Sequence, residues 1–443
     1  MTPSNTITPP YLLGQGEVKM PHISSIIYPP TLDFHYLVQR PQQLMKSFSQ
    51  LGIPSYFMNV PNPLRPVSHG LEKINQHLYV FNHADPYRSF QPVMPVVYFS
   101  ATWHINMVHK YNPSLIVFDS VDEPCDEFAS WRPHYHKAVT MSDIVLATSD
   151  PLYQAAKAMN PNTFLVPNGC DFEFFSQAQR PEGETPSDIA AVKKPIIGYI
   201  GAVASWLDLD LLEQLALSHP EYNIVMIGPM YNVHKVPQPA NIHWLGFKDY
   251  DLLPSYARVF DVGIIPFKNT RMVSAVNPIK MWEYMAVGMP IVTTAVPETL
   301  KHGSLLWYSR TREEFFQNIS AALNENSEER KNQRREIARH NSWLSRAQSI
   351  KQLLENALET KKNAGLLPEN LPAPPDFERF MDASRRLRLR PYAHTNHKLR
   401  SVKARHHITP PRNALISAGP QHTNPDPNFT VKTLSPYHVG SVV

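Results

Sequence analysis

The chain has 443 residues, of which 42% are hydrophobic and 10% aromatic, so it can build two or three domains with cores and is not wholly disordered. No apolar run approaches the ~18–20 residues of a membrane-spanning helix, and two cysteines, Cys125 and Cys170, exclude a disulfide scaffold and a multi-cysteine zinc module. The first residues carry no signal-peptide pattern, so we expect a soluble, cytoplasmic protein.

The formal net charge of +4 is unevenly distributed along the chain. The residues after Asn363 carry eleven Lys/Arg and five Asp/Glu, a net of +6, and the preceding chain sums to −2. The run Ser384–Pro391 (SRRLRLRP) contains no aromatic residue, which argues against a base-stacking surface and a specific nucleic-acid partner. Clustered cations attract anionic lipid headgroups and polyanions, so the tail predicts peripheral contact with an anionic membrane or polyanion. The alternative is a solvated extension without a partner.

Residues 1–20 show no hydrophobic periodicity, which predicts a flexible arm. Short apolar runs then alternate with helical or loop spacers, which is typical of a doubly wound parallel sheet. A first helix is expected at Pro41–Leu51, because proline stands in its first turn and Gly52 follows its end. The expected strands are Ile23–Ile27, Ser55–Val60, Leu78–Asn82, Val96–Ser100, Leu115–Asp119, Ile144–Thr148 and Phe164–Pro167.

A polar stretch at Gln177–Lys194 predicts a linker, after which the alternation restarts. The second set of strands is expected at Pro195–Ile200, Asn223–Ile227, Ile242–Leu245, Val262–Pro266 and Pro290–Thr294. Helices are expected at Leu207–Ser218, Leu252–Arg258, Pro278–Val287, Thr311–Asn324 and Ser342–Glu359.

This order predicts two Rossmann-like domains that face a cleft, with ligands at the carboxyl ends of the strands. The expected divisions are an arm at 1–20, an N-terminal acceptor-side domain at 21–180, a C-terminal nucleotide-sugar domain at 181–341, a crossing helix at 342–362 and a disordered, Pro/His-rich basic tail at 363–443.

The most informative stretch is Phe260–Thr294, FDVGIIPFKNTRMVSAVNPIKMWEYMAVGMPIVTT. Its loop Ser274–Ile279 leads into a helix N-terminus, whose free N–H groups and positive dipole end favour phosphate. Lys280 in the first turn can pair with phosphate as a point charge. Glu283, one turn later on the same side, can accept hydrogen bonds from two ribose hydroxyls. The stretch therefore predicts a site for a nucleoside diphosphate.

This stretch resembles the signature N-P-x-K-x-x-E-Y-x-A-x-G-x-P-[IV]-V of GT-B glycosyltransferases of the family-4 type, most closely the teichuronic-acid and spore-coat-polysaccharide class. The matching residues are Asn277, Pro278, Lys280, Glu283, Tyr284, Ala286, Gly288, Pro290, Ile291 and Val292. Other stretches resemble the family in the same order, and together they cover roughly residues 22–360. They are Gln39–Leu44, Val117–Glu123, Ser142–Phe175 and Ile197–Leu212.

The resemblance implies the GT-B fold and a hexosyltransferase-type activity (EC 2.4) with a nucleotide-diphosphate sugar, most simply UDP-linked, as donor. It further implies transfer with retention, no required metal or other cofactor, and a glycan or lipid-linked acceptor of the cell wall or spore coat. The protein would then work in the cytoplasm, at the membrane periphery or with the spore coat. The donor-binding residues that it implies are Gly201, Trp206, Gly228, Gly246, Phe247, Asn277, Pro278, Ile279, Lys280 and Glu283.

Two family features are missing from this sequence. Ala275 stands where relatives place a first Glu near the donor sugar, and the turn Gly201–Trp206 lacks the Arg and Lys that hold the diphosphate in many relatives. The phosphate cations would then be Lys280 together with Lys268 or Arg271.

On the acceptor side, Asp119 occupies the place of a family histidine, and Asp122 follows three residues later. Carboxylates at the end of a buried strand can orient or deprotonate an acceptor hydroxyl, so both are candidate catalytic residues. The alternative for Asp119 is a turn cap. Arg40 and His104 are candidate substrate-binding residues, and a structural ion pair is the alternative for Arg40.

No metal site is expected. Asp208-Leu-Asp210 spells a metal-binding pattern, but the two acids fall at a helix start, where acids are common. His134 and His136 lack a third ligand and are expected to be surface residues.

Ala275 and the missing cations leave a second hypothesis open, in which a non-catalytic carbohydrate-binding or coat-assembly protein keeps the GT-B fold. A sugar-nucleotide epimerase on the same two-domain fold is a third hypothesis, which the N-P-x-K-x-x-E-Y block disfavours. Fold alone does not decide function, so measurements of nucleotide binding and turnover are needed to distinguish these three hypotheses.

Overall fold

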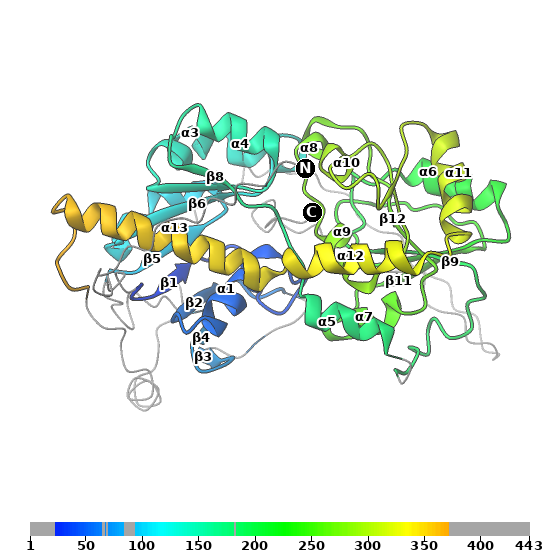
Figure 1. Cartoon of the computed structure of the whole chain (residues 1–443), viewed down its shortest axis with the longest axis horizontal. Helices are drawn as coiled ribbons and strands as arrows, with labels where there is room; N and C mark the ends of the chain where they lie inside the picture. The colour runs from blue at the N-terminus through cyan, green and yellow to red at the C-terminus, as the bar shows by residue number, and fades with distance from the viewer. Residues whose placement is uncertain (1–22, 64–66, 68–69, 84–93, 181–182, 372–443) are drawn as a thin grey trace, which may run out of the picture.

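The computed structural model describes residues 23–63, 67, 70–83, 94–180 and 183–371. Within these residues the chain forms two α/β units side by side, each built on one sheet (Figure 1). The predicted arm 1–20 and the tail from 372 onward lie outside the described residues. No helix in the described part of the chain is long and apolar enough to cross a membrane.

The first sheet has the strand order β3-β4-β2-β1-β5-β6-β7-β8. All neighbouring pairs are parallel except β3 with β4, which is antiparallel. Most of its strands are buried along their whole length, because helices or loops cover both faces. The strands are β1 (Ile26–Tyr28), β2 (Ser55–Asn59), β3 (Gly70–Lys73), β4 (Leu78–Asn82), β5 (Val96–Phe99), β6 (Leu115–Ser120), β7 (Ile144–Ala147) and β8 (Thr163–Leu165).

The second sheet is parallel throughout, with the order β11-β10-β9-β12-β13-β14. The order reverses beside β9, so the loops after β9 and β12 diverge there and open a crevice, as in other doubly wound sheets. The strands are β9 (Ile196–Ile200), β10 (Asn223–Ile227), β11 (Ile242–Gly246), β12 (Val262–Ile265), β13 (Ile291–Thr293) and β14 (Trp307–Tyr308). The expected pair of doubly wound parallel sheets is therefore confirmed.

The helices pack on these sheets and connect them. Those of the first unit are α1 (Arg40–Gln50), α3 (Arg132–Thr140) and α4 (Asp150–Lys157), whereas α5 (Phe172–Ser176) packs on the second unit (Figure 1). Those that follow are α6 (Leu209–Ser218), α7 (Leu253–Ala257), α8 (Arg271–Ser274), α9 (Ile279–Val287), α10 (Pro297–Leu300), α11 (Arg312–Leu323), α12 (Glu328–His340) and α13 (Trp343–Asn363).

The chain passes between the units at two adjacent places. After β8 it runs through Gly169 and Cys170 into the second unit, and between α12 and α13 it returns beside the same residues. Trp343 N donates to Cys170 O at 2.9 Å, and an added Cβ on Gly169 would lie 2.4 Å from Asn341 O. Figure 1 shows α12 over the second unit and α13 along the first. The buried side of α13 joins the core around β1 and α1.

Several elements were not expected from the sequence, α12 and β3 among them. Helix α12 was not expected, because its sequence EERKNQRREIARH has almost no apolar periodicity. It forms because Ser327 caps its start and because the buried Arg334 donates to Glu325, to Leu305 O and to Gly288 O. The antiparallel β3 was also not expected, because its GLEK sequence is short and half-exposed.

Candidate functional site

A pocket lies between the two units, at the carboxyl ends of β9 and β10 and beside the first turn of α9. The first unit contributes a short segment just before and at the start of α1, and the second unit contributes the remaining walls. The lining residues are Leu37, Val38, Gln39, Ile200, Gly201, Ala202, Ile227, Gly228, Pro229, Phe247, Lys248, Tyr250, Leu253, Ile279, Lys280 and Glu283.

Two glycines allow the backbone to approach closely at the floor of this pocket. Gly201 and Gly228 follow β9 and β10 with φ of +149° and +145°, values that L side chains rarely adopt. A Cβ added to Gly228 would lie 1.9 Å from Gly201 O, and one added to Gly201 would lie 2.9 Å from Lys280 Cε. Glycine at both positions therefore leaves room for the Lys280 stem and for the facing loops.

Lys280 and Glu283 are the charged pair of the pocket. Their exposed fractions are 5% and 7%, and within the described residues neither charged group makes a hydrogen bond or ion pair. Lys280 Nζ instead lies over the rings of Phe267 and Tyr199, 4.7 and 5.3 Å from the centroids. A buried charge without a partner is costly, and a ligand with both an anion and hydrogen-bond donors would compensate both groups.

The pKa values of the pair follow from this burial. Desolvation lowers the pKa of Lys280 to about 8, and the nearby Glu283 charge only partly opposes it. Desolvation likewise raises the pKa of Glu283 to about 7, against the opposing charge of Lys280. Strongly perturbed titratable groups in a cleft are typical of functional sites.

Asn277, just before α9, lies outside the pocket lining and ties the two units together. Its Oδ1 accepts from Asn168 N at 3.2 Å and from Trp282 Nε1 at 2.9 Å, and its carbonyl accepts from Asn168 Nδ2 at 2.7 Å. Its Nδ2 donates to the buried Glu298 at 3.1 Å. Asn277 thus fixes the loop that carries Lys280, while Pro278 serves as the N-cap residue of α9.

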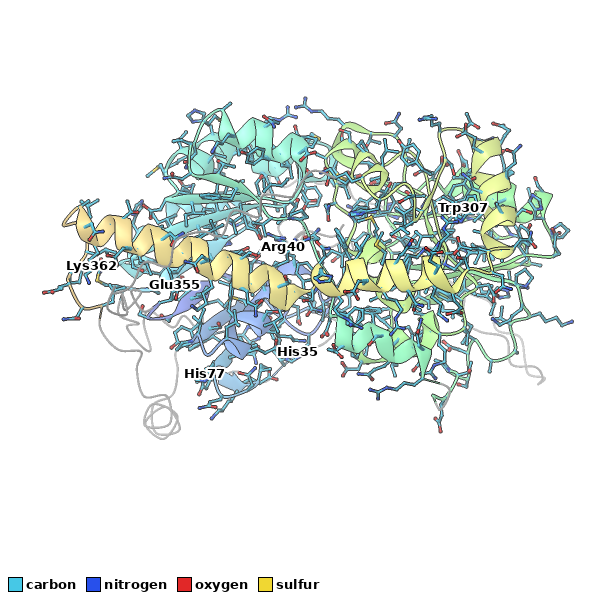
Figure 2. All side chains as sticks on the ribbon, in the orientation of Figure 1. His35, Arg40, His77, Trp307, Glu355 and Lys362 are labelled. Carbon is cyan, nitrogen blue, oxygen red and sulfur yellow. The ribbon has the colours of Figure 1, made fainter. Side chains whose placement is uncertain are left out.

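Arg40 and Asp119 form a buried ion pair rather than facing the pocket. Arg40 Nε and Nη2 donate to the two Asp119 oxygens at 2.7 and 3.0 Å, and Tyr98 OH donates to Asp119 Oδ2 at 2.6 Å. Arg40 Nη1 donates to Asn168 Oδ1 at 3.2 Å. Figure 2 shows Arg40 at the side of the first unit that faces the second. The structure therefore shows the ion-pair alternative for Arg40. Both oxygens of Asp119 are used in this pair.

Asp122 has a different environment from Asp119. It is 3% exposed, and Oδ2 has no hydrogen-bond partner. Desolvation, with smaller contributions from the charges of Asp119 and Glu127, raises its pKa to about 8. The loop that it begins reaches the second unit, where Glu123 pairs with Arg271 at 2.7 Å and Asp126 accepts from Met272 N at 3.2 Å.

His104 lies in the core of the first unit, away from the pocket lining. Its Nε2 lies 3.1 Å from Thr31 Oγ1 and its Nδ1 lies 3.3 Å from Met107 Sδ. Burial lowers its pKa to about 3, so the ring is neutral. His104 is therefore a core residue whose two ring nitrogens both have partners within the first unit.

Three other expected donor residues are placed as follows. Trp206 is buried in the core of the second unit, Gly246 is exposed at the end of β11, and neither lines the pocket. Phe247 does line it. Ala275, which replaces the family's first Glu, is buried against Ala147 and Leu152 of the first unit.

The alternative phosphate cations are engaged elsewhere. Lys268 Nζ donates to Ser205 O at 2.8 Å, and Arg271 pairs with Glu123. Asp208 caps α6 by accepting from Leu211 N at 3.0 Å. In the described part of the chain, no group of three or more His, Cys, Asp or Glu side chains is placed to hold a metal ion.

The sequence analysis did not identify Leu37, Val38, Lys248 and Tyr250 as lining residues. The block Gln39–Leu44 indicated that this region matters but pointed to the charged Arg40. Lys248 is held by Asp188 at 2.6 Å, and Tyr250 OH accepts from Gln43 Nε2 at 2.7 Å. These contacts join segments far apart in the chain, so no local pattern predicts them.

Comparison with known proteins finds a family match within the second unit. Residues 194–325 match the family model described as "Glycosyl transferases group 1". The second unit is thus similar to this family over residues 194–325. The chain is 27% identical over 222 residues to TuaH of Bacillus subtilis (strain 168), which is named for teichuronic acid biosynthesis. That match covers 47% of this chain and 55% of TuaH, so the chain spans about half the length of this curated relative.

Solved structures show the fold of both units together. Sucrose-phosphate synthase from Thermosynechococcus elongatus is similar with a TM-score of 0.57 at 14% identity, over 76% of this chain and 100% of that one. HepE from Anabaena, in complex with UDP-glucose, is similar with a TM-score of 0.56 at 12% identity. This match covers 75% of this chain and 99% of HepE. The chain therefore has the GT-B fold, as the sequence predicted.

Proposed function

We propose that the protein is a glycosyltransferase of the hexosyltransferase type, which moves a sugar from a UDP-linked donor to a glycan of the cell surface or spore coat. The observation that carries this proposal is the buried, unpartnered pair Lys280 and Glu283 at the carboxyl ends of a parallel sheet. An anion and hydroxyl donors in one small molecule satisfy both groups, and a nucleoside diphosphate sugar has both.

The donor side of the site follows from the pocket. Lys280 and the first turn of α9 would bind the diphosphate, and they would stabilise the negative charge that grows on it as the sugar departs. Glu283 would accept the ribose hydroxyls. Main chain at Gly201 and Gly228 would approach the ligand, because no side chain intervenes there. The UDP-glucose complex of HepE, a protein of the same fold, supports a UDP-linked donor.

On the acceptor side we propose Asp122, with Asp119 and Arg40 holding its surroundings in place. With a pKa of about 8, Asp122 is protonated at neutral pH and would hydrogen-bond an acceptor hydroxyl rather than remove its proton. The departing phosphate would then take the hydroxyl proton. The glycan acceptor is inferred from the name of TuaH, and the basic residues after Asn363 would hold the enzyme near an anionic membrane or polyanion.

Nucleotide binding tests the proposal directly. Calorimetry of the full chain should show that UDP binds more tightly than GDP or ADP. Lys280→Met and Glu283→Gln should each weaken UDP binding by more than tenfold, about 1.4 kcal/mol. Glu329→Gln, at an exposed position on α12, is the matched control and should bind like the wild type.

Turnover is measured next, by hydrolysis or transfer of UDP-sugars. A folded wild type that binds none of the three diphosphates at millimolar concentration refutes the proposed function. Binding of UDP without any turnover would leave the carbohydrate-binding or coat-assembly hypothesis instead.

A further inference from the structure

Asn168 lies on the segment that first connects the two units, and all four of its polar groups are used. On the second unit, its N–H donates to Asn277 Oδ1 at 3.2 Å and its Nδ2 donates to Asn277 O at 2.7 Å. On the first unit, its Oδ1 accepts from Arg40 Nη1 at 3.2 Å. Its carbonyl accepts from Nε and Nη2 of Arg346, on α13, at 3.3 and 3.2 Å. Asn168 is 5% exposed and does not line the pocket, so it links the units without facing a ligand.

The two cations that hold Asn168 are themselves fixed. Arg40 is 1% exposed, and its ion pair with Asp119 sets the direction of the guanidinium group. Arg346 lies with its guanidinium carbon 5.7 Å from the centroid of the Trp282 ring. Neither cation can move without losing several contacts, so the first unit and α13 hold Asn168 at one place.

On the other side, Asn277 stands just before α9 and three residues before Lys280. Besides Asn168 it contacts Trp282 on α9 and Glu298 on α10. Its position therefore sets where α9 begins, and with it the direction of Lys280 and of the first N–H groups of the helix. These are the groups proposed above to bind the diphosphate. A small displacement of such groups weakens binding strongly, because contacts to phosphate need short distances and good alignment.

We propose that Asn168 is a positioning residue for the diphosphate site, because it holds the loop at Asn277 from which α9 and Lys280 follow. This inference rests on the proposed function. The groups that would bind phosphate all belong to the second unit, whereas Asn168 is supported by Arg40 of the first unit and by α13. The phosphate site is therefore complete only while the two units stay docked at this segment.

A buried asparagine elsewhere in the first unit provides the matched control. Asn160 is also 5% exposed, and its Nδ2 donates to Val139 O and to Ser142 O, at 2.8 Å each. Asn160→Ala and Asn168→Ala should both lower the unfolding temperature, because each leaves buried polar groups without a partner. Only the substitution at Asn168 should change the affinity for a ligand with a diphosphate.

The experiment is calorimetry and thermal unfolding of the full chain, with UDP and uridine as probes that carry and lack the diphosphate. Asn168→Ala should bind UDP about tenfold more weakly than the wild type, and uridine with unchanged affinity. Asn168→Asp is a second variant with nearly the same shape. It keeps an oxygen for Arg40 but places another oxygen against Asn277 O, so it should fold and weaken UDP binding at least as much.

Three results overturn the inference. The first is wild-type affinity for UDP in both Asn168 variants. The second is an equal loss of affinity for uridine, and the third is an equal loss of UDP affinity in Asn160→Ala, because each of these marks a general effect on the fold. Failure of the wild type to bind UDP is a distinct result, which refutes the proposed function and, with it, this inference.

Discussion

Replacing Asp122 by asparagine should stabilise the protein, and the gain should grow with pH. The folded state holds the pKa of this carboxyl at about 8, against 3.8 for an ordinary aspartate. Between these pH values the folded state keeps the proton that the unfolded state has already lost. Stability falls with rising pH wherever the native state binds more protons. Asparagine has nearly the same shape and does not titrate, so the stability of the variant does not fall with pH for this reason.

The magnitude follows from the span between the two pKa values. About 4 pKa units at about 1.4 kcal/mol each give a ceiling of roughly 6 kcal/mol, reached at and above pH 8. The gain vanishes below about pH 4, where both states are protonated. Relaxation of the loop and entry of water reduce the measured value, but even a third of the ceiling is a large fraction of typical domain stability.

The assay is urea unfolding of wild type and Asp122→Asn at pH 5, 6.5 and 8. At each pH the free energies of unfolding of the two proteins are compared. This difference cancels the titration of the other buried groups. Asp119→Asn is the matched control with the opposite expectation, since it leaves the buried Arg40 without its partner and should cost about 3–5 kcal/mol. A stability difference for Asp122→Asn that stays flat from pH 5 to 8 would refute the reasoning. The same variant should keep wild-type affinity for UDP but lose turnover.

Two further predictions concern the donor pocket. UDP affinity should peak between about pH 7 and 8, since Lys280 loses its proton above about 8 and Glu283 gains one below about 7. Calorimetry that gave the same affinity at pH 6, 7.5 and 9 would contradict this prediction. Gly228→Ala should weaken UDP binding by at least tenfold, because its Cβ would lie 1.9 Å from Gly201 O. Gly52→Ala, with φ +77° and nothing within 4 Å, shares the strained backbone alone and should cost about 1–2 kcal/mol of stability without changing affinity.

Much of the fold and half of the pocket could be predicted from sequence, because those features are local. Apolar runs bounded by turn residues mark strands such as β9 and β10 to within a residue or two. Lys280 and Glu283 fall one helical turn apart after a proline, so their placement on one side of α9 follows from helix geometry alone. Helix α12 escaped prediction because the burial of Arg334 depends on acceptors contributed by distant segments.

The acceptor side was harder to predict, because an aspartate's chemistry depends on partners that the local sequence does not specify. Asp119 and Asp122 are three residues apart and look equivalent in the sequence. The fold gives one of them a guanidinium and a phenol, and gives the other no partner for Oδ2. Asp119 therefore has a structural role in the ion pair, whereas Asp122 has a raised pKa.

The same logic separates Arg40 from Lys280. Both side chains are charged and buried, but within the described residues Arg40 is paired and Lys280 is not. Arg40 uses three of its nitrogens within the protein, whereas Lys280 Nζ lies only over the rings of Phe267 and Tyr199. In a cleft between two domains, the groups free to bind are therefore those whose desolvation the fold can tolerate without a partner. By that criterion Lys280, Glu283 and Asp122 are the groups from which binding and transfer should be reconstructed.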